Sequence, residues 1–173
     1  MPPKGHAVLS ASSSDRWLHC PPSARLCESY DDKGSDYAAE GTDAHALCEY
    51  KLRKALGIEA EDPTKSLTWF NEEMDDCATG YVAYVLEQIE AAKQFCNDPV
   101  VLIEQRVDFS RWVEGGFGTA DALIIADGTL KICDYKHGLG VLVRAEENPQ
   151  LMCYAIGALE LFDKIYDIET VSM

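Results

Sequence analysis

Three side chains that can do chemistry lie close together at a predicted β-hairpin: Asp121, Asp134 and Lys136. Two apolar segments, residues 117–126 and 129–135, have the composition of strands, and the Asp-Gly pair between them is a two-residue hairpin signal. Because side chains alternate along a strand, Asp134 and Lys136 are expected on one face of the sheet. Asp121, on the partner strand, shares that face if the register allows.

Carboxylates that meet at one point repel each other unless a cation joins them. Hard oxygen ligands of this kind suit Mg²⁺ or Mn²⁺, and a lysine beside them can orient a water or stabilise charge on a phosphate. A single Asp in a hairpin is more often simply solvated. Here both acids belong to apolar strands, where an unpaired charge is costly, so the pattern favours a metal site.

Composition narrows the class of protein. The chain has 173 residues, 47% of them apolar, which is enough for a domain with a sizeable core. There is neither an apolar run long enough to span a membrane nor a signal-peptide pattern, so we expect no membrane partner, a cytoplasmic location and reduced thiols. No C-x-x-C pair occurs, which argues against a zinc ribbon. Four cysteines lie in apolar patterns and are expected in the core: Cys48, Cys77, Cys133 and Cys153.

The formal net charge is −15. A protein that coats nucleic acid broadly is normally basic, so this charge argues against such a role. It is compatible with an enzyme whose cleft alone is positive, because metal-binding carboxylates add negative charge that the cation offsets.

The remaining pattern predicts an α/β fold, with a mixed central sheet flanked by helices in a single domain over residues 1–173. Residues 31–39 are polar and are expected to form a mobile loop. The last predicted strand stops at Met173 as soon as it begins, so we expect either a truncated C-terminal end or a partner that completes the sheet edge. The other elements are predicted as helices over 15–20, 42–56, 67–95 and 149–161, and strands over 100–109 and 168–173.

The order and spacing of these residues resemble the PD-(D/E)XK nuclease superfamily, particularly its RecB-like branch of helicase-nucleases and phage recombination exonucleases. Each matching motif is weak alone, but together they follow one order through most of the chain. The matching positions are residues 10–21, Glu40-Gly41-Thr42 with His45, Glu104, Asp121, Asp134 with Lys136, and Gln150-Leu151 with Tyr154.

The resemblance implies a restriction-endonuclease-like core and assigns roles. Asp121 and Asp134 would bind the divalent metal together with the backbone carbonyl of Tyr135. Lys136 would position the attacking water. Glu104 and His45 would complete the metal shell or hold the water, and Gln150 and Tyr154 would face the site, contacting DNA or fixing the lysine. Arg106 and Arg144 are candidates for contact with DNA phosphates, although solvated surface is the simpler expectation for each.

Several of these residues have a structural alternative. His45 lies at the edge of an apolar stripe and fits a core histidine equally well. Glu104 can pair with Arg106 on the same strand face. Gln150 can cap its helix, and Tyr154 can be ordinary core packing.

The resemblance therefore implies a divalent-metal-dependent DNA nuclease, an exonuclease of phage or bacterial recombination and repair, with DNA and a recombination protein as partners. Some RecB-like nucleases hold an iron–sulfur cluster through one early and three late cysteines. The late group is absent here, so no cluster is expected within this chain. One alternative is a catalytically silent DNA-binding or assembly module with the same fold. A second is a metal-dependent hydrolase of a small phosphoester.

Overall fold

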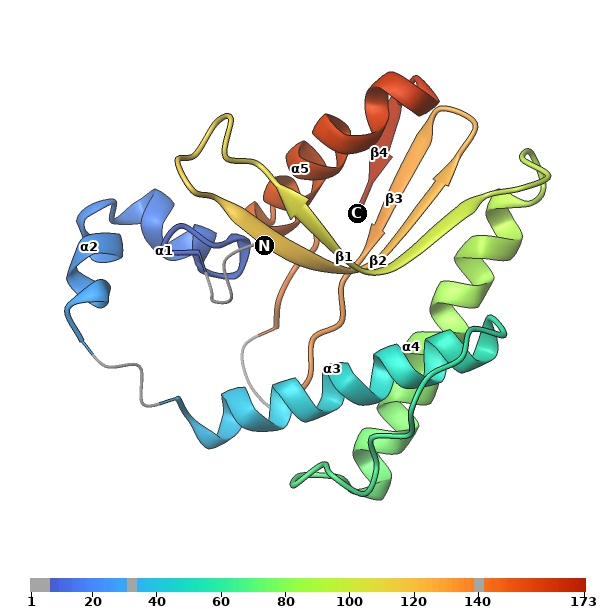
Figure 1. Cartoon of the computed structure of the whole chain (residues 1–173), viewed down its shortest axis with the longest axis horizontal. Helices are drawn as coiled ribbons and strands as arrows, with labels where there is room; N and C mark the ends of the chain where they lie inside the picture. Colours follow the sequence, from blue (N-terminus) through green and yellow to red (C-terminus); the bar gives the residue numbers. More distant parts are fainter. Residues whose placement is uncertain (1–6, 31–33, 139–141) are drawn as a thin grey trace.

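The computed structural model describes residues 7–30, 34–138 and 142–173. At its centre is a four-stranded mixed sheet in the order β1-β2-β3-β4, with helices on both faces (Figure 1). The first three strands are antiparallel neighbours, and β4 pairs parallel to β3. This confirms the predicted α/β fold with a mixed sheet. The strands are β1 (Val100–Asp108), β2 (Phe117–Ala126), β3 (Thr129–Cys133) and β4 (Thr170–Ser172).

The helices form two layers around this sheet. Helices α3 and α4 pack on one face, while α5 packs on the other together with the N-terminal segment (Figure 1). Within the described residues, none of the helices combines the length and apolar character needed to cross a membrane. The helices are η1 (Ala11–Ser13), α1 (Ser14–His19), α2 (Pro22–Glu28), α3 (Asp36–Ala55), α4 (Glu72–Ala92) and α5 (Pro149–Tyr166).

The N-terminal half contains two corrections to the predicted helices. Helix α2 was not predicted, because the Pro21-Pro22 pair indicated only a stop; Pro22 in fact begins a new helix, where a missing N–H costs nothing. Helix α3 begins at Asp36 rather than at residue 42, with the Ser35 hydroxyl accepting from the Ala38 N–H as an N-cap. The predicted loop is therefore helical from Asp36 on, and its residues 31–33 lie outside the described residues.

The other boundaries follow the same logic of capping. Helix α4 was predicted over 67–95 but begins at Glu72, because Asn71 accepts a hydrogen bond from the Met74 N–H, and it ends at Ala92. Helix α5 begins at Pro149, as predicted, with Asn148 accepting from two backbone N–H groups, and it runs on to Tyr166. The hairpin strand β2 has the predicted bounds.

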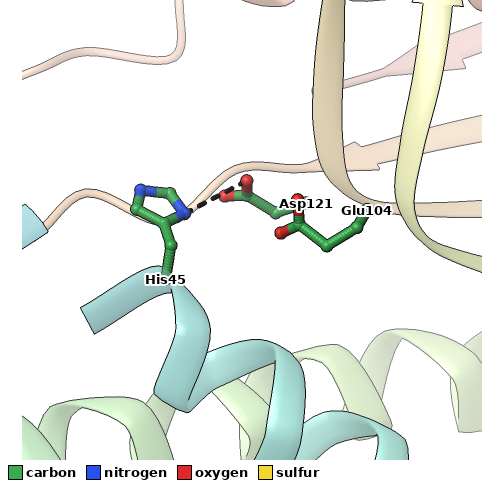
Figure 2. Close-up of side chains that lie close together, drawn as sticks. All are labelled: His45, Glu104 and Asp121. Atoms are coloured by element: carbon green, nitrogen blue, oxygen red, sulfur yellow. Dashed lines mark ion pairs between the residues drawn. The ribbon is translucent and has the colours of Figure 1, made fainter. Parts of the chain in front are cut away.

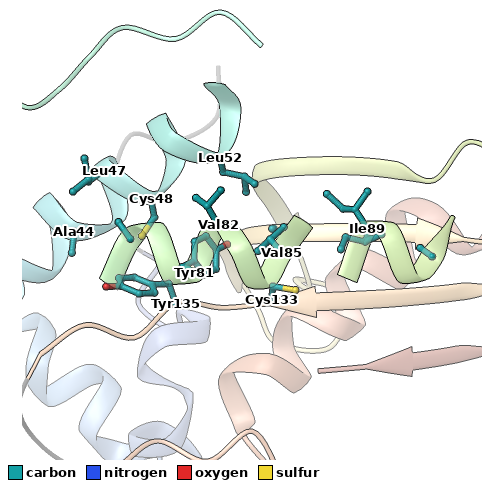
Figure 3. Close-up of a cluster of buried hydrophobic side chains, with 14 of the residues drawn as sticks. Ala44, Leu47, Cys48, Leu52, Tyr81, Val82, Val85, Ile89, Cys133 and Tyr135 are labelled. Atoms are coloured by element: carbon teal, nitrogen blue, oxygen red, sulfur yellow. The ribbon is translucent and has the colours of Figure 1, made fainter. Parts of the chain in front are cut away.

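A buried cluster between the sheet and helices α3 and α4 holds this side of the molecule together (Figure 3). The sequence pattern predicts an apolar stripe on α3 that includes Ala44, Leu47, Cys48, Leu52 and Ala55. The first four are buried as predicted, but the prediction for Ala55 is wrong, because this residue in the last turn of the helix is exposed. Cys133 and Cys153 are buried as predicted, but the prediction for Cys77 is wrong. Cys77 is exposed, because it faces a surface cavity rather than the cluster.

The side-chain alternation of β1 changes phase at Glu104. Ile103 packs with the cluster under α3 and α4, whereas Val107 belongs to the cluster under α5. In a regular strand these two residues would share a face. Between them, Glu104 has a φ of 51°, in the left-handed region that costs a non-glycine residue free energy.

Strand β2 changes phase opposite the same point. Ala120 packs in the α5 cluster and Ala122 in the α3/α4 cluster, although they are two residues apart. The pairing of β1 with β2 keeps one register on both sides and is interrupted only between Ile103 and Gln105. Asp121 therefore lies opposite Glu104 where the two strands exchange core faces, and both carboxylates occupy the junction between the two buried clusters.

Candidate active site

Asp121 is the centre of the site. It lies on β2 with only 8% of its surface exposed. Its Oδ2 accepts a 2.6 Å hydrogen bond from the backbone N–H of Tyr135, and its Oδ1 lies 3.2 Å from Nδ1 of His45 on α3 (Figure 2). The carboxylate thus joins three elements: the strand that carries it, the segment after β3, and helix α3.

Glu104 completes a group of three possible metal ligands. One ligand atom each from His45, Glu104 and Asp121 lies within 4.8 Å of the other two, and Figure 2 shows their side chains converging from α3, β1 and β2. No other such group occurs among the described residues. Two carboxylate oxygens and one imidazole nitrogen fit a divalent cation of the Mn²⁺ or Mg²⁺ type, with the imidazole favouring Mn²⁺.

Glu104 and His45, the two members of this group that flank Asp121, hold protons more strongly than usual. Burial, together with the charges of Asp121 and Glu49, raises the pKa of Glu104 to about 7. Burial alone would lower the pKa of His45, but the hydrogen bond and charge of Asp121 outweigh it and raise that pKa. Raised pKa values of this kind indicate an excess of negative charge at the site, which a bound cation would neutralise.

Asp134 and Lys136 lie just beyond β3 rather than on it, since the strand ends at Cys133. The prediction that the strand extends to residue 135 is wrong: the N–H of Tyr135 donates to the Asp121 side chain rather than to a backbone carbonyl of β2. The side chains of Asp134 and Lys136 nevertheless meet, as the Lys136 Nζ forms an ion pair with Asp134 Oδ2. Burial raises the pKa of Asp134, an effect that Lys136 opposes and Asp121 reinforces.

Gln150 and Tyr154, one turn apart on α5, support this pair. The Gln150 Nε2 donates to the Tyr154 hydroxyl at 2.8 Å and to Asp134 Oδ1 at 3.3 Å. The N-cap of α5 is Asn148, so the alternative of Gln150 as a helix cap is wrong. Tyr154 is buried as well as hydrogen-bonded, so its packing and its predicted place near the site are both observed.

The remaining predicted residues are less closely engaged. Asp134 is not one of the three converging ligands, and its metal role, like that of the Tyr135 carbonyl, stays a prediction. The guanidinium of Arg106 lies over the ring of Phe117, 3.6 Å from its centroid, rather than in an ion pair with Glu104. Arg144 is exposed and lines a depression of about 180 Å³ with Asp134 and Lys136.

Sequence reasoning missed a second chain of polar side-chain contacts beside the site. The hydroxyl of Tyr135 lies 3.0 Å from His137 Nδ1, and His137 Nε2 lies 3.5 Å from Glu40 Oε1 on α3. The chain ties the segment that carries Lys136 to the helix that carries His45. The one signal in the sequence was the adjacency of Tyr135 and His137 to Lys136, and it gave no hint of Glu40 as partner.

The protein is thus an α/β protein with a candidate cation site at the junction of its two buried clusters. The profile of one protein family, described as a protein of unknown function (DUF2800), matches residues 6–173. The chain belongs to this family. No solved structure matches the chain.

The raised pKa values predict that the metal-free protein loses stability as the pH rises. Glu104 ionises with a pKa near 4.5 when unfolded and about 7 when folded, so the folded state binds more protons between these values. The stability that protonated Glu104 contributes is then fully present below about pH 4.5 and is lost as the pH rises through 7. His45 and Asp134, whose pKa values are also raised, act in the same direction. Because Glu104 is partly exposed, we expect a loss of about 1–2 kcal/mol, measured by urea denaturation in EDTA between pH 5 and pH 8.

The matched variant is Glu104→Gln, which cannot ionise. It should remove much of the pH dependence, and saturating Mn²⁺ should stabilise the wild type more at pH 8 than at pH 5. An unchanged slope in Glu104→Gln would show that Glu104 does not hold the proton.

The packing of Gly118 on β2 against Tyr154 can be tested by substitution. A Cβ at Gly118 would lie 2.7 Å from a ring carbon of Tyr154 and 2.9 Å from the Ala11 Cβ. Gly118→Ala should therefore cost about 1–3 kcal/mol in urea denaturation, as overpacking does, and should shift the Tyr154 ring. Gly80→Ala is the control, because that helical position is open and alanine should stabilise it by up to about 1 kcal/mol. Equal stability of Gly118→Ala and wild type would contradict the close packing.

Proposed function

We propose that the protein is a divalent-metal-dependent DNA nuclease that hydrolyses phosphodiester bonds, with a restriction-endonuclease-like core. The observation that carries the proposal is the convergence of His45, Glu104 and Asp121 beside the ion pair of Lys136 with Asp134. The resemblance of the sequence to RecB-like nucleases favours DNA as the substrate. It is also the only support for an exonuclease role in phage or bacterial recombination.

The residues of the site have distinct tasks in this proposal. His45, Glu104 and Asp121 would hold the cation, with Asp134 adding negative charge nearby. The bound ion would supply Lewis acidity for attack by water on phosphorus and would offset charge on the reacting oxygens.

Lys136 carries the positive charge that this chain contributes. Its side chain is 40% exposed, while the side chain of its partner Asp134 is almost fully buried. The lysine is thus anchored at one side and open to a substrate phosphate, or to the attacking water, at the other. Gln150 holds Asp134 from α5, so the ion pair keeps its position.

The direct test is cleavage of end-labelled linear DNA and of circular DNA, with Mg²⁺, Mn²⁺ or EDTA. The proposal expects cleavage with either metal and none in EDTA. Loss of linear DNA alone would identify an exonuclease, and cutting of the circle an endonuclease. Absence of cleavage under every condition, in a folded protein that binds Mn²⁺, would overturn the proposal.

The two other functions stay as alternatives with their own outcomes. A catalytically silent DNA-binding module would bind DNA in Ca²⁺ without cutting it in Mn²⁺. A hydrolase of small phosphoesters would act on a compound such as p-nitrophenyl phosphate and leave DNA intact. Lys136 lines both the depression that contains Arg144 and a larger cavity on its other side. Two adjoining surface hollows favour a polymeric substrate over a small one.

A further inference from the structure

A cavity of about 360 Å³ adjoins the site on the side of Lys136 that faces helices α3 and α4. Its walls come from the start of α3, the start of α4 and the segment after β3. Pockets of this size hold small organic groups. None of the three converging metal ligands lines it, so it is separate from the candidate metal site. Its lining includes Tyr37, Glu40, Glu73, Tyr135, Lys136 and His137.

The charge of this cavity differs from that of the depression on the other side of Lys136. The depression contains Arg144 and Lys136 against a single acid, Asp134, which suits a phosphate. The cavity instead contains Glu40 and Glu73, and two carboxylates repel a phosphate. Lys136 lines both the cavity and the depression. A nucleic-acid strand that passes over Lys136 therefore meets a wall suited to its backbone on one side and a wall unsuited to it on the other.

The cavity has the groups that bind a nucleobase. Tyr37 as a residue is 79% exposed, so its side chain is available for stacking with a base. The carboxylates of Glu40 and Glu73 accept hydrogen bonds from exocyclic amino groups of the kind that cytosine and adenine carry. The back wall is held in place by the polar contacts described above, which join Tyr135 to His137 and His137 to Glu40.

We propose that this cavity is a subsite for one unpaired nucleobase next to the phosphate held at Lys136, with Tyr37 as its stacking platform. The inference rests on the proposed nuclease function and adds its substrate class: single-stranded DNA or a frayed duplex end. A paired base cannot enter, because both of its faces are stacked within the duplex and its edge is engaged with its partner. Bases with an exocyclic amino group should be preferred to thymine.

The test uses single-stranded oligonucleotides that carry the fluorescent base 2-aminopurine at successive positions, titrated with the protein in Ca²⁺ to prevent cutting. In the wild type, one position should be strongly quenched by stacking. Tyr37→Ala should abolish that quenching and weaken binding about tenfold. Tyr37→Phe, which keeps the ring, should restore both. Blunt duplex, whose end must fray before a base can enter the cavity, should lose less affinity than single strands in Tyr37→Ala.

The control is Tyr30→Ala, because Tyr30 is comparably exposed but does not line the cavity. If Tyr37→Ala behaves like Tyr30→Ala in a protein that cleaves DNA, the base subsite is wrong and the nuclease function stands. If Tyr37→Ala weakens blunt duplex and single strands alike, Tyr37 acts without base recognition and the subsite is again wrong. If the wild type neither binds nor cleaves DNA while it still binds Mn²⁺, the proposed function fails together with the subsite.

Discussion

Replacing Asp121 by asparagine is expected to abolish Mn²⁺ binding and DNA cleavage together. Asp121 contacts both His45 and the Tyr135 backbone, so its charge lies at the centre of the candidate metal site. Asparagine keeps the size and one acceptor oxygen but removes the charge that attracts the cation. We expect Mn²⁺ affinity to fall by about 100-fold or more and cleavage by about 10³-fold or more. Calorimetric titration with Mn²⁺ and cleavage of end-labelled DNA measure the two effects.

Asp127→Asn is the matched control for this variant. Asp127 is in the turn of the same hairpin, is exposed, and has a φ of 42°, which asparagine tolerates. It should bind Mn²⁺ and cleave DNA like the wild type. Asp121→Asn should remain folded in EDTA, because it removes a negative charge beside Glu104, whose pKa that charge raises. Wild-type Mn²⁺ affinity in Asp121→Asn would disprove the metal assignment.

Replacing Lys136 by alanine is expected to separate chemistry from binding. Its ammonium is paired with Asp134, its side chain is partly exposed, and it is not one of the three converging ligands. Loss of a positive charge that acts on the water or the transition state should lower the cleavage rate about 10²- to 10³-fold. Mn²⁺ affinity should change little, since all three converging ligands remain. Single-turnover cleavage and Mn²⁺ calorimetry on the same preparation measure both quantities.

Lys131→Ala is the control for the loss of a lysine in this part of the chain. Lys131 lies on β3 and donates to Gln88, away from the three ligands, so its removal should leave the cleavage rate unchanged. Circular dichroism separates a catalytic from a structural effect of Lys136→Ala: a folded spectrum with lost cleavage supports the catalytic role. A wild-type cleavage rate in this variant would exclude it.

Local signals in the sequence were sufficient for much of the fold. The apolar alternation of residues 117–126 and the Asp127-Gly128 turn predicted β2 and its hairpin, because both features act between near neighbours. Asn148 and Pro149 located the start of α5 for the same reason. The start of α3 was missed, because its cap at Ser35 follows a polar stretch with no apolar periodicity.

The end of β3 is a feature that the local sequence pattern did not predict. The apolar pattern continues to residue 135, but the strand ends at Cys133 because a side chain, that of Asp121, takes the Tyr135 N–H. The left-handed turn at Glu104 likewise has no signal in the pattern of β1, where the apolar residues 100–103 precede it and the mixed residues 105–108 follow it. Such a conformation is tolerated only because two cores meet there, and a core is not a property of one segment.

The sequence by itself determined which side chains can do chemistry and which strand or helix carries most of them. Tertiary structure alone decided their partners: His45 with Asp121, Gln150 with Asp134, and His137 with Glu40. Each pair joins segments that are distant in the chain, and their approach depends on how α3 and α5 pack on the two faces of the sheet. Periodicity reveals that a helix has a buried face, but it carries no record of the strand residue that this face will meet.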